Sequence, residues 1–177
     1  MNTFFTADLH LDHANIIKHC DRPFSNKDEM NDTIIKNWNS VVTNNDKVFI
    51  LGDFVWTENK SRILELIELL NFRTLYLLPG NHDRERILKA LPLHTERKVE
   101  LLPTLYDTKI DDLSITLCHY PMISWNKSFH GAWQLFGHVH GREIPINKKL
   151  QLDVGVDTNN FYPYDLETIK KTLEPQK

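Results

Sequence analysis

The chain has 177 residues, 41% of them hydrophobic and 25% charged, a composition that predicts one domain over residues 1–177 with a continuous buried core. Its net charge of −3 and pI near 6.3 give no broad basic field, so duplex DNA or RNA is not an expected partner. The two cysteines, Cys20 and Cys118, form no Cys-x-x-Cys pair, which argues against a disulfide scaffold and a structural zinc knuckle.

Short apolar runs alternate with amphipathic stretches along the chain, and this alternation predicts a layered α/β or α+β architecture. The first run predicts a strand at 3–7. Because the run stops at Asp8, it is far short of a signal peptide or a membrane span, and we expect a cytoplasmic protein without a membrane partner. A helix is expected after Ser25, which resembles a capping box together with Asp28. The buried face of this helix is expected to carry Met30, Ile34, Trp38 and Val41.

The later elements follow from the same two periodicities. In chain order we predict a strand at 48–51, a helix at 61–70, a strand at 74–78, a helix at 84–91, strands at 99–102, 113–117, 133–136 and 150–154, and a terminal helix at 165–173. The helix at 61–70 has its apolar stripe at Ile63, Ile67 and Leu70.

Polar side chains follow four of these strands at the point where each strand ends. They are Asp8, Asp53, Asn81 and His119. Because loops that leave the carboxyl ends of strands converge on one crevice in open α/β sheets, we expect these side chains to meet. Carboxylate, imidazole and amide oxygen are ligands of divalent transition metals, so the sequence predicts a metal site at this edge.

Two closely spaced pairs add to this set. One residue separates Asp8 from His10, and one separates His138 from His140. In an extended backbone, such spacing turns both side chains of a pair to one face. The donors together exceed what a single tetrahedral ion can use, so we predict two ions about 3.5 to 4 Å apart that share one carboxylate.

Each of these short blocks also has a purely structural interpretation. Gly52-Asp53 and Gly80-Asn81 are typical of turns, and His119 alone would be read as a hydrogen-bonded core histidine. A two-histidine alternation between glycines, at 137–141, is hard to explain by packing. The combination of blocks therefore favours the metal site over the separate structural interpretations.

The order Asp-x-His, Gly-Asp, Gly-Asn-His-Asp, His and Gly-His-x-His, over residues 8–140, closely resembles the calcineurin-like metallophosphoesterase superfamily. The opening segment, residues 8–24, is similar to small bacterial and phage members. The resemblance implies a two-sheet β-sandwich flanked by helices, with a dinuclear metal centre at one end. It implies one ion held by Asp8, His10 and His140, a second held by Asn81, His119 and His138, and Asp53 as the bridge between them.

The resemblance also implies a reaction. A metal-bound hydroxide would attack phosphorus in line while the ions neutralise charge on the phosphoryl oxygens. His82 would act as general acid toward the departing alkoxide, and Asp83 would orient the His82 imidazole. The mixed ligands suit Mn, Fe, Co, Ni or Zn, of which we expect Mn.

The expected substrate is a small phosphoester, which can be a nucleotide. Gly52-Asp53 is followed by Phe54, without the Asp-Arg-Gly of protein serine/threonine phosphatases, and this departure favours a phosphodiesterase. A phosphomonoesterase of small molecules or nucleotides stays the alternative. A non-catalytic metal-binding scaffold of the same fold is the alternative of another class, and the presence of every expected ligand together with His82 argues against it.

Two further residues are candidates for the site. His13 follows the first metal block, where it would contact the substrate or support a ligand at the start of a short helix capped by Asp12, although a solvated helix-start histidine fits the sequence equally well. Arg142 follows the last block and could hold a phosphate, although a solvated surface role is also compatible with its position. The sequence carries no signal for the oligomeric state.

Overall fold

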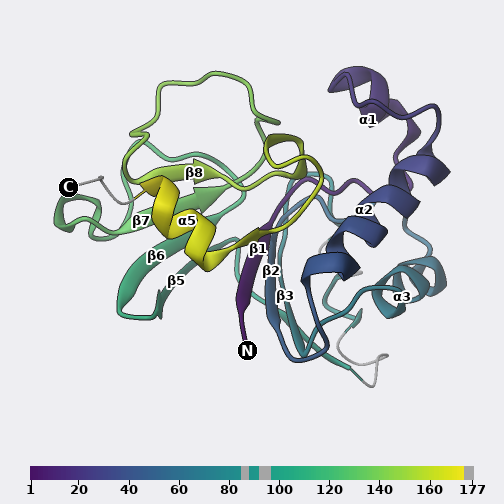
Figure 1. The fold of residues 1–177 in the computed structure, drawn as a ribbon, viewed down its shortest axis with the longest axis horizontal. Coiled ribbons are helices and arrows are strands. Elements are labelled where there is room, and N and C mark those ends of the chain that lie inside the picture. Colours follow the sequence, from purple (N-terminus) through teal and green to yellow (C-terminus); the bar gives the residue numbers. More distant parts are fainter. Residues whose placement is uncertain (85–87, 92–96, 174–177) are drawn as a thin grey trace.

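A computed structural model describes residues 1–84, 88–91 and 97–173, and in them two β-sheets are flanked by helices (Figure 1). The first sheet contains β1 (Thr3–Thr6), β2 (Lys47–Leu51), β3 (Thr74–Leu78), β4 (Lys98–Leu101) and β9 (Tyr164–Asp165). The second contains β5 (Leu105–Ile110), β6 (Leu113–Cys118), β7 (Trp133–Phe136) and β8 (Gln151–Asp153). The helices with described bounds are α1 (Ala14–His19), α2 (Lys27–Val41), α3 (Lys60–Glu68) and α5 (Leu166–Leu173). The predicted mixed α/β fold, with two sheets flanked by helices, is confirmed.

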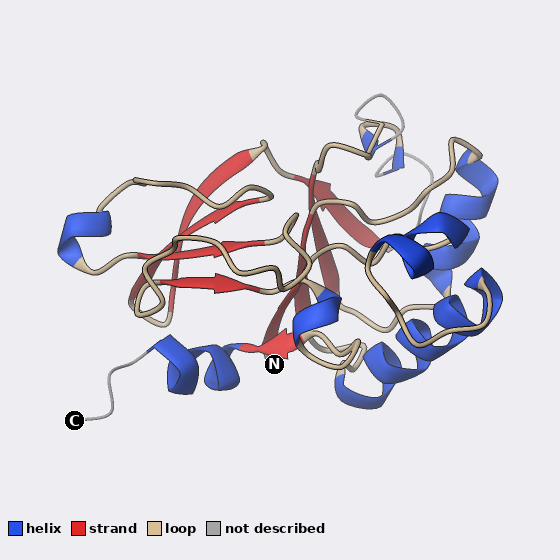
Figure 2. Cartoon of the chain, turned by 90° about the horizontal axis from the view of Figure 1, so that it is seen from above, coloured by secondary structure: helices blue, strands red, loops and turns tan. Residues whose placement is uncertain are grey.

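The first sheet has the strand order β4-β3-β2-β1-β9, in which β1 to β4 are parallel and β9 is antiparallel to β1. The second has the order β5-β6-β7-β8, in which β6, β7 and β8 are parallel and β5 is antiparallel. Figure 2 shows most of the helices gathered beside the first sheet, on the side away from the second. The parallel strands β1, β2 and β3 therefore end at one common edge of their sheet.

Strands β1 to β3 are buried on both faces. On β2, Val48 and Ile50 belong to a core shared with α2 and α3, whereas Phe49 and Leu51 belong to a core shared with β6, β7 and α5. A strand covered on both faces is apolar along its whole length, so it appears in the sequence as an uninterrupted hydrophobic run. This explains why the apolar runs predict β1, β2 and β3 to within one residue, and the other predicted strands are also present with their ends shifted by at most one residue.

Two strands were not predicted. Strand β5 is an edge strand whose residues are at most half-buried, and three consecutive polar residues interrupt its sequence Leu-Tyr-Asp-Thr-Lys-Ile. Strand β9 has two residues, too few for a periodic pattern. The helix predicted at 84–91 falls partly on residues 85–87, which lie outside the described residues.

Helix α2 begins one residue later than the capping box predicted. The side chain of Asn26 accepts hydrogen bonds from the backbone N–H of Asp28 at 3.0 Å and of Glu29 at 2.9 Å, so Asn26 is the N-cap. The carboxylate of Glu29 accepts a hydrogen bond from the backbone N–H of Ser25 at 2.7 Å. The predicted pairing of Ser25 with Asp28 is therefore wrong, because Asn26 offers a better placed acceptor to the free amides of the first turn.

Two other local predictions are wrong. Val41 is 40% exposed, and Val42, just past the end of α2, is buried instead. Helix α1 is not capped by Asp12, because the carboxylate of Asp12 accepts hydrogen bonds from the side chains of Asn31 and Arg62. Asp12 thus links the loop after β1 to helices α2 and α3.

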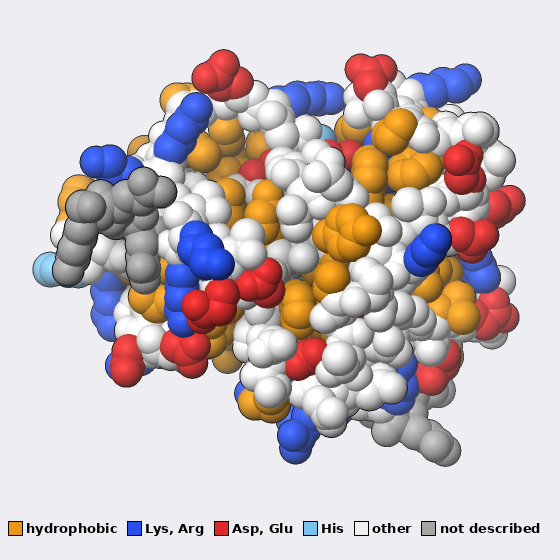
Figure 3. All heavy atoms as spheres, viewed as in Figure 1, with side chains coloured by type: hydrophobic (Ala, Val, Ile, Leu, Met, Phe, Trp, Pro, Cys, Tyr) orange, Lys and Arg blue, Asp and Glu red, His pale blue; other side chains and the backbone are white. Residues whose placement is uncertain are grey.

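On the face drawn in Figure 3, acidic and basic side chains are interspersed without a broad basic area. Within the described part of the chain, no helix combines the length and the hydrophobicity that a bilayer span requires.

The cap of α2 yields a matched pair of variants. Asn26→Ala removes the acceptor of two backbone amides and should lower the free energy of unfolding by about 1 kcal/mol. Ser25→Ala keeps the backbone N–H that Glu29 binds, so it should change stability by less than about 0.5 kcal/mol. Urea denaturation measures both, and equal effects of the two variants would contradict the observed cap.

Candidate metal centre

The loops that leave β1, β2, β6 and β7 are joined by hydrogen bonds at one end of the two sheets. The backbone N–H of Asp8 donates to the carbonyl of Gly52 at 3.1 Å, and that of Gly137 donates to the carbonyl of His119 at 3.0 Å. The two sheets are joined where the backbone N–H of His138 donates to the Asp8 carboxylate at 2.8 Å. The strand ends converge as the sequence predicted.

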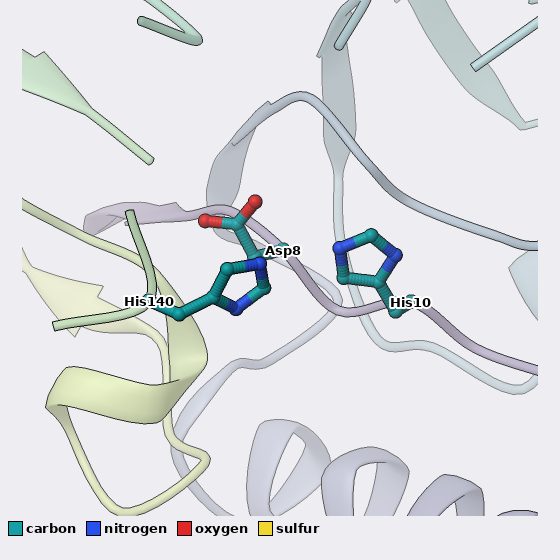
Figure 4. A group of neighbouring side chains, drawn as sticks. All are labelled: Asp8, His10 and His140. Atoms are coloured by element: carbon teal, nitrogen blue, oxygen red, sulfur yellow. The ribbon is translucent and has the colours of Figure 1, made fainter. Parts of the chain in front are cut away.

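Two groups of side chains there have the spacing of metal ligands. Asp8, His10 and His140 each offer one ligand atom, and these atoms lie within 4.8 Å of one another. Figure 4 shows the three together, with His10 on the same loop as Asp8 and His140 on a different segment. Asp8, Asp53 and His119 form a second group by the same measure. The two groups share Asp8.

Asp53 lies between histidines of the two groups. Its Oδ2 atom is 3.5 Å from Nε2 of His10 and 3.4 Å from Nε2 of His119. Its Oδ1 atom accepts a hydrogen bond from the backbone N–H of His82 at 2.9 Å. One carboxylate oxygen therefore faces two imidazole nitrogens, while the other is held by the backbone.

The ring of His119 is oriented by a backbone carbonyl. Its Nδ1 atom lies 2.8 Å from the carbonyl oxygen of Leu51, which can only accept, so Nδ1 carries a proton. Its Nε2 atom lies 3.0 Å from Oδ1 of Asn81 and also faces Asp53. A neutral His119 would present a lone pair to these oxygens, so the arrangement requires either an imidazolium or a cation between them. The ring of His138 lies beside that of His119, with centroids 5.2 Å apart.

Two buried polar atoms fit a bound cation. Within the described part of the chain, Oδ1 of Asp8 and Nε2 of His10 have no hydrogen-bond partner. Leaving such an atom unsatisfied in the interior costs about 1 to 3 kcal/mol, and more for a charged group. Both are electron-pair donors of the first group, so a divalent cation would satisfy them together.

Burial and neighbouring histidines together control the protonation of these groups. It raises the pKa of the Asp8 carboxyl to about 7 and lowers the pKa of the His10 imidazole to about 3. Burial would also raise the pKa of Asp53, but the hydrogen bond and charge of His119 outweigh it and hold that pKa at about 2. Asp53 is therefore ionised and His10 neutral at neutral pH, while Asp8 needs nearby positive charge to stay fully ionised.

The backbone at these positions is not extended, and that prediction for the two spaced pairs is wrong. Positive φ angles occur at Asp8 (57°), His10 (51°), Asp53 (54°), His138 (72°) and His140 (52°). This left-handed region is sparsely populated by residues other than glycine, and each such residue stores of order 1 to 3 kcal/mol. The tight turns bring alternate side chains of each loop toward the same centre.

Close packing explains the glycines that precede the candidate ligands. Gly52 has a φ of +94°, and a Cβ atom there would lie 2.5 Å from Nδ1 of His119. A Cβ atom on Gly137 would lie 2.5 Å from the Asp8 carboxylate. The Gly-Asp and Gly-His blocks therefore have a steric reason in addition to a turn preference.

The carboxylate of Asp83, predicted to orient the His82 imidazole, binds backbone groups. It accepts hydrogen bonds from the backbone N–H groups of Asp53 at 2.7 Å, Phe54 at 3.1 Å and Gly80 at 2.9 Å. Both oxygens are thus used to join the loops after β2 and β3. This arrangement does not support a role in orienting the His82 imidazole, and it makes Asp83 a support for the turn that carries Asp53.

The rings of His82 and His13 both lie close to that of His10 and to each other, with 6.3 Å between the His13 and His82 centroids. The exposed His82 ring is 5.5 Å from the His10 ring, centroid to centroid. The buried His13 has its Nδ1 atom 3.4 Å from Nδ1 of His10, on the side of the ring away from Asp53. His13 therefore supports a candidate ligand. Arg142 is exposed, with its guanidinium 3.5 Å from the carbonyl oxygen of His19, and is not part of either ligand group.

The sequence analysis missed two residues that support the site. Asp157 accepts a hydrogen bond from Nδ1 of His140 at 2.7 Å, which leaves Nε2 of His140 available to a metal. The buried Arg22 pairs with both oxygens of Asp157 at 2.8 Å and donates to the backbone carbonyls of Asp8 and Leu9. A weaker signal existed at Asp157, which comes shortly after the predicted strand at 150–154 and two residues after Gly155.

Comparisons with known proteins agree with this architecture. Residues 1–142 match the family described as calcineurin-like phosphoesterase. An uncharacterized protein of Methanocaldococcus jannaschii is 36% identical over 98% of this chain and 92% of its own length. The gene 66 protein of Mycobacterium phage L5 is 29% identical over 88% of this chain and 86% of its own length.

Two solved structures share the fold. A protein of unknown function from Aquifex aeolicus has a TM-score of 0.75 and 23% identity, and the match covers 96% of this chain and 98% of that one. An archaeal phosphodiesterase has a TM-score of 0.50 and 19% identity, over 94% of this chain and 99% of that one. At this level of identity, the likeness concerns the fold alone.

The contact between Asp157 and His140 can be tested with a matched substitution. Asp157→Asn weakens the acceptor that orients His140, and it should lower the affinity for Mn²⁺ by roughly 10- to 100-fold in a calorimetric titration. Asp165→Asn serves as the control, because Asp165 binds Thr168 at the start of α5, away from both ligand groups. Unchanged affinity in Asp157→Asn would show that His140 does not need this partner.

Proposed function

Because the chain belongs to the calcineurin-like phosphoesterase family, and is a hydrolase of phosphoester bonds, we propose that it cleaves small phosphodiesters with two divalent metal ions. Asp8, His10 and His140 would hold one ion, and Asn81, His119 and His138 the other, with Asp53 between them. We expect Mn, although the donor set also suits Fe, Co, Ni or Zn.

The position of Asp53 carries this proposal. One carboxylate oxygen within 3.5 Å of Nε2 atoms from both ligand sets has the placement of a bridging ligand. A shared carboxylate also reduces the repulsion between two dications at close range. Asp8 belongs to both groups of ligand-spaced side chains, so the two sites are close neighbours.

When bound, the ions would supply Lewis acidity that polarises the phosphoryl oxygens and lets a water molecule ionise near neutral pH. The chain's own residues perform the other tasks. His119 and His140 are oriented by Leu51 and Asp157. His82, at the exposed margin of the ligand set, would protonate the leaving oxygen, and its ring lies 5.5 Å from that of His10.

The charges around the site favour a diester. Arg22 is fully engaged with Asp157 and two backbone carbonyls. Arg142 is not part of the ligand groups. With these guanidinium groups engaged or elsewhere, a monoanionic diester fits better than a dianionic monoester, and a phosphomonoesterase is the second candidate.

Metal stoichiometry and substrate choice together test the proposal. The chain should bind two equivalents of Mn²⁺ in a calorimetric titration, and the loaded protein should hydrolyse bis-p-nitrophenyl phosphate with a higher kcat/KM than p-nitrophenyl phosphate. Asp53→Asn should weaken both binding events because its carboxylate serves both sites. If the unmodified chain bound only one Mn²⁺ ion, or if Asp53→Asn weakened only one of the two binding events, the carboxylate would not be shared. A higher kcat/KM for the monoester would favour the phosphomonoesterase.

The acid role of His82 has its own test. His82→Ala should retain both Mn²⁺ ions but lose about 100-fold or more in kcat with a diester that has an alkoxide leaving group. With a nitrophenolate leaving group, which scarcely needs a proton, the loss should be below about 10-fold. His130→Ala, in an exposed turn between β6 and β7 and in neither ligand group, provides the control. Equal losses with both leaving groups would rule out proton donation by His82.

A further inference from the structure

A cavity adjoins His82 outside the two ligand groups. Its volume is about 280 Å³, and it is lined by Trp56, Thr57, Glu58, His82 and Arg84. None of the other four lining residues belongs to the candidate metal ligands. The cavity therefore lies on the His82 side of the site and offers an indole, a hydroxyl, a carboxylate and a guanidinium to whatever enters it.

The indole of Trp56 is fixed relative to the metal centre. The backbone N–H of Trp56 donates to the carbonyl of Leu11 at 2.8 Å, in the loop that carries Asp8 and His10. Its ring is stacked on the His13 imidazole, with centroids 4.0 Å apart and planes 7° apart. Because His13 in turn contacts His10, the position of the indole is coupled to that of a candidate ligand.

One face of this indole is open. Trp56 is 46% exposed although His13 covers one face of its ring. The His82 ring lies 4.9 Å from the Trp56 ring and 6.3 Å from the His13 ring. If the His82 ring lay over the face of the indole opposite His13, its distance from the His13 ring would be much longer than the observed 6.3 Å. The His82 ring therefore lies at the edge of the Trp56 ring. A second flat ring can therefore stack on the face opposite His13.

The polar groups of the cavity suit a nucleoside. Glu58 and Arg84 form an ion pair at 2.9 Å and are 59% and 70% exposed, so both can exchange partners at little cost. A carboxylate accepts hydrogen bonds from sugar hydroxyls, and a guanidinium donates to the oxygens of a base. An exposed indole provides the stacking platform that nucleobases use in proteins.

We propose that this cavity binds the leaving nucleoside of a nucleotide phosphodiester, with its base stacked on Trp56. This inference rests on the proposed function, since His82 must face the departing oxygen. In the reaction, the oxygen of water forms a bond to phosphorus while the bond between phosphorus and the nucleoside oxygen breaks and leaves its electron pair on that oxygen. His82 gives its proton to that oxygen, and the proton lost by water replaces it over the cycle. The leaving nucleoside thus occupies the His82 side, where the cavity lies.

The proposal is tested with two diesters that differ only in the base of the leaving group. One is a dinucleotide, and the other is the same compound with an abasic sugar on the leaving side. The Mn²⁺-loaded full chain should have a kcat/KM roughly 5- to 100-fold higher for the dinucleotide, as expected for one stacked base. Trp56→Ala should reduce this ratio to about one, whereas Trp56→Phe should retain most of it.

A control variant separates stacking from a general loss of activity. Phe129→Ala removes another exposed aromatic ring, outside the cavity, and should leave the ratio at its original value. If Trp56→Ala lowers both rates equally and keeps the ratio, Trp56 only supports His13 and the proposal is overturned.

Hydrolysis of bis-p-nitrophenyl phosphate tests the proposed function independently of the nucleoside site, because this diester contains no nucleoside. Hydrolysis of that diester without any preference for the dinucleotide over its abasic analogue would overturn the nucleoside site alone. Hydrolysis of none of the three compounds by the loaded chain would overturn the proposed function and this inference together.

Discussion

The structure around the site has to stabilise two buried carboxylates, Asp8 and Asp53, which lie at the ends of adjacent parallel strands. A negative charge shielded from water is stable only when it is hydrogen-bonded, paired or bound to a cation. Asp53 receives a backbone hydrogen bond and faces two histidines, and its pKa is low. Asp8 keeps one oxygen without a partner within the described part of the chain, and its pKa is high. The proposed cations would remove this imbalance.

The polypeptide around these carboxylates is held by contacts between elements rather than by local helix or sheet structure. Asp83 binds three backbone amides from the loops after β2 and β3. Arg22 links the loop after β1 to Asp157, which orients His140. These contacts offset the cost of several left-handed turns, which explains how a strained backbone persists at the site.

The proposed chemistry divides the site into two sides. The ligand groups occupy the ends of the strands, where buried histidines and carboxylates would hold the ions. His82 lies between these ligands and the cavity that contains Trp56, and most of the residues that line the cavity are exposed. The stack of Trp56 on His13, and the contact of His13 with His10, join the two sides physically. Substrate preference and metal binding are thus expected to be coupled through one aromatic contact.

The sequence alone determined the strands and the residue types at their ends. Continuous apolar runs such as 48–51 mark strands buried on both faces, and the polar residues that follow them, such as Asp53, lie where parallel strands must end together. Only the tertiary structure decided that Asp83 binds the backbone of Asp53, 30 positions away, and that Arg22 meets Asp157 across 135 positions of the chain. Periodicity reports burial over a few neighbouring residues, whereas those contacts depend on turn geometry and topology, which bring together groups that no local pattern relates.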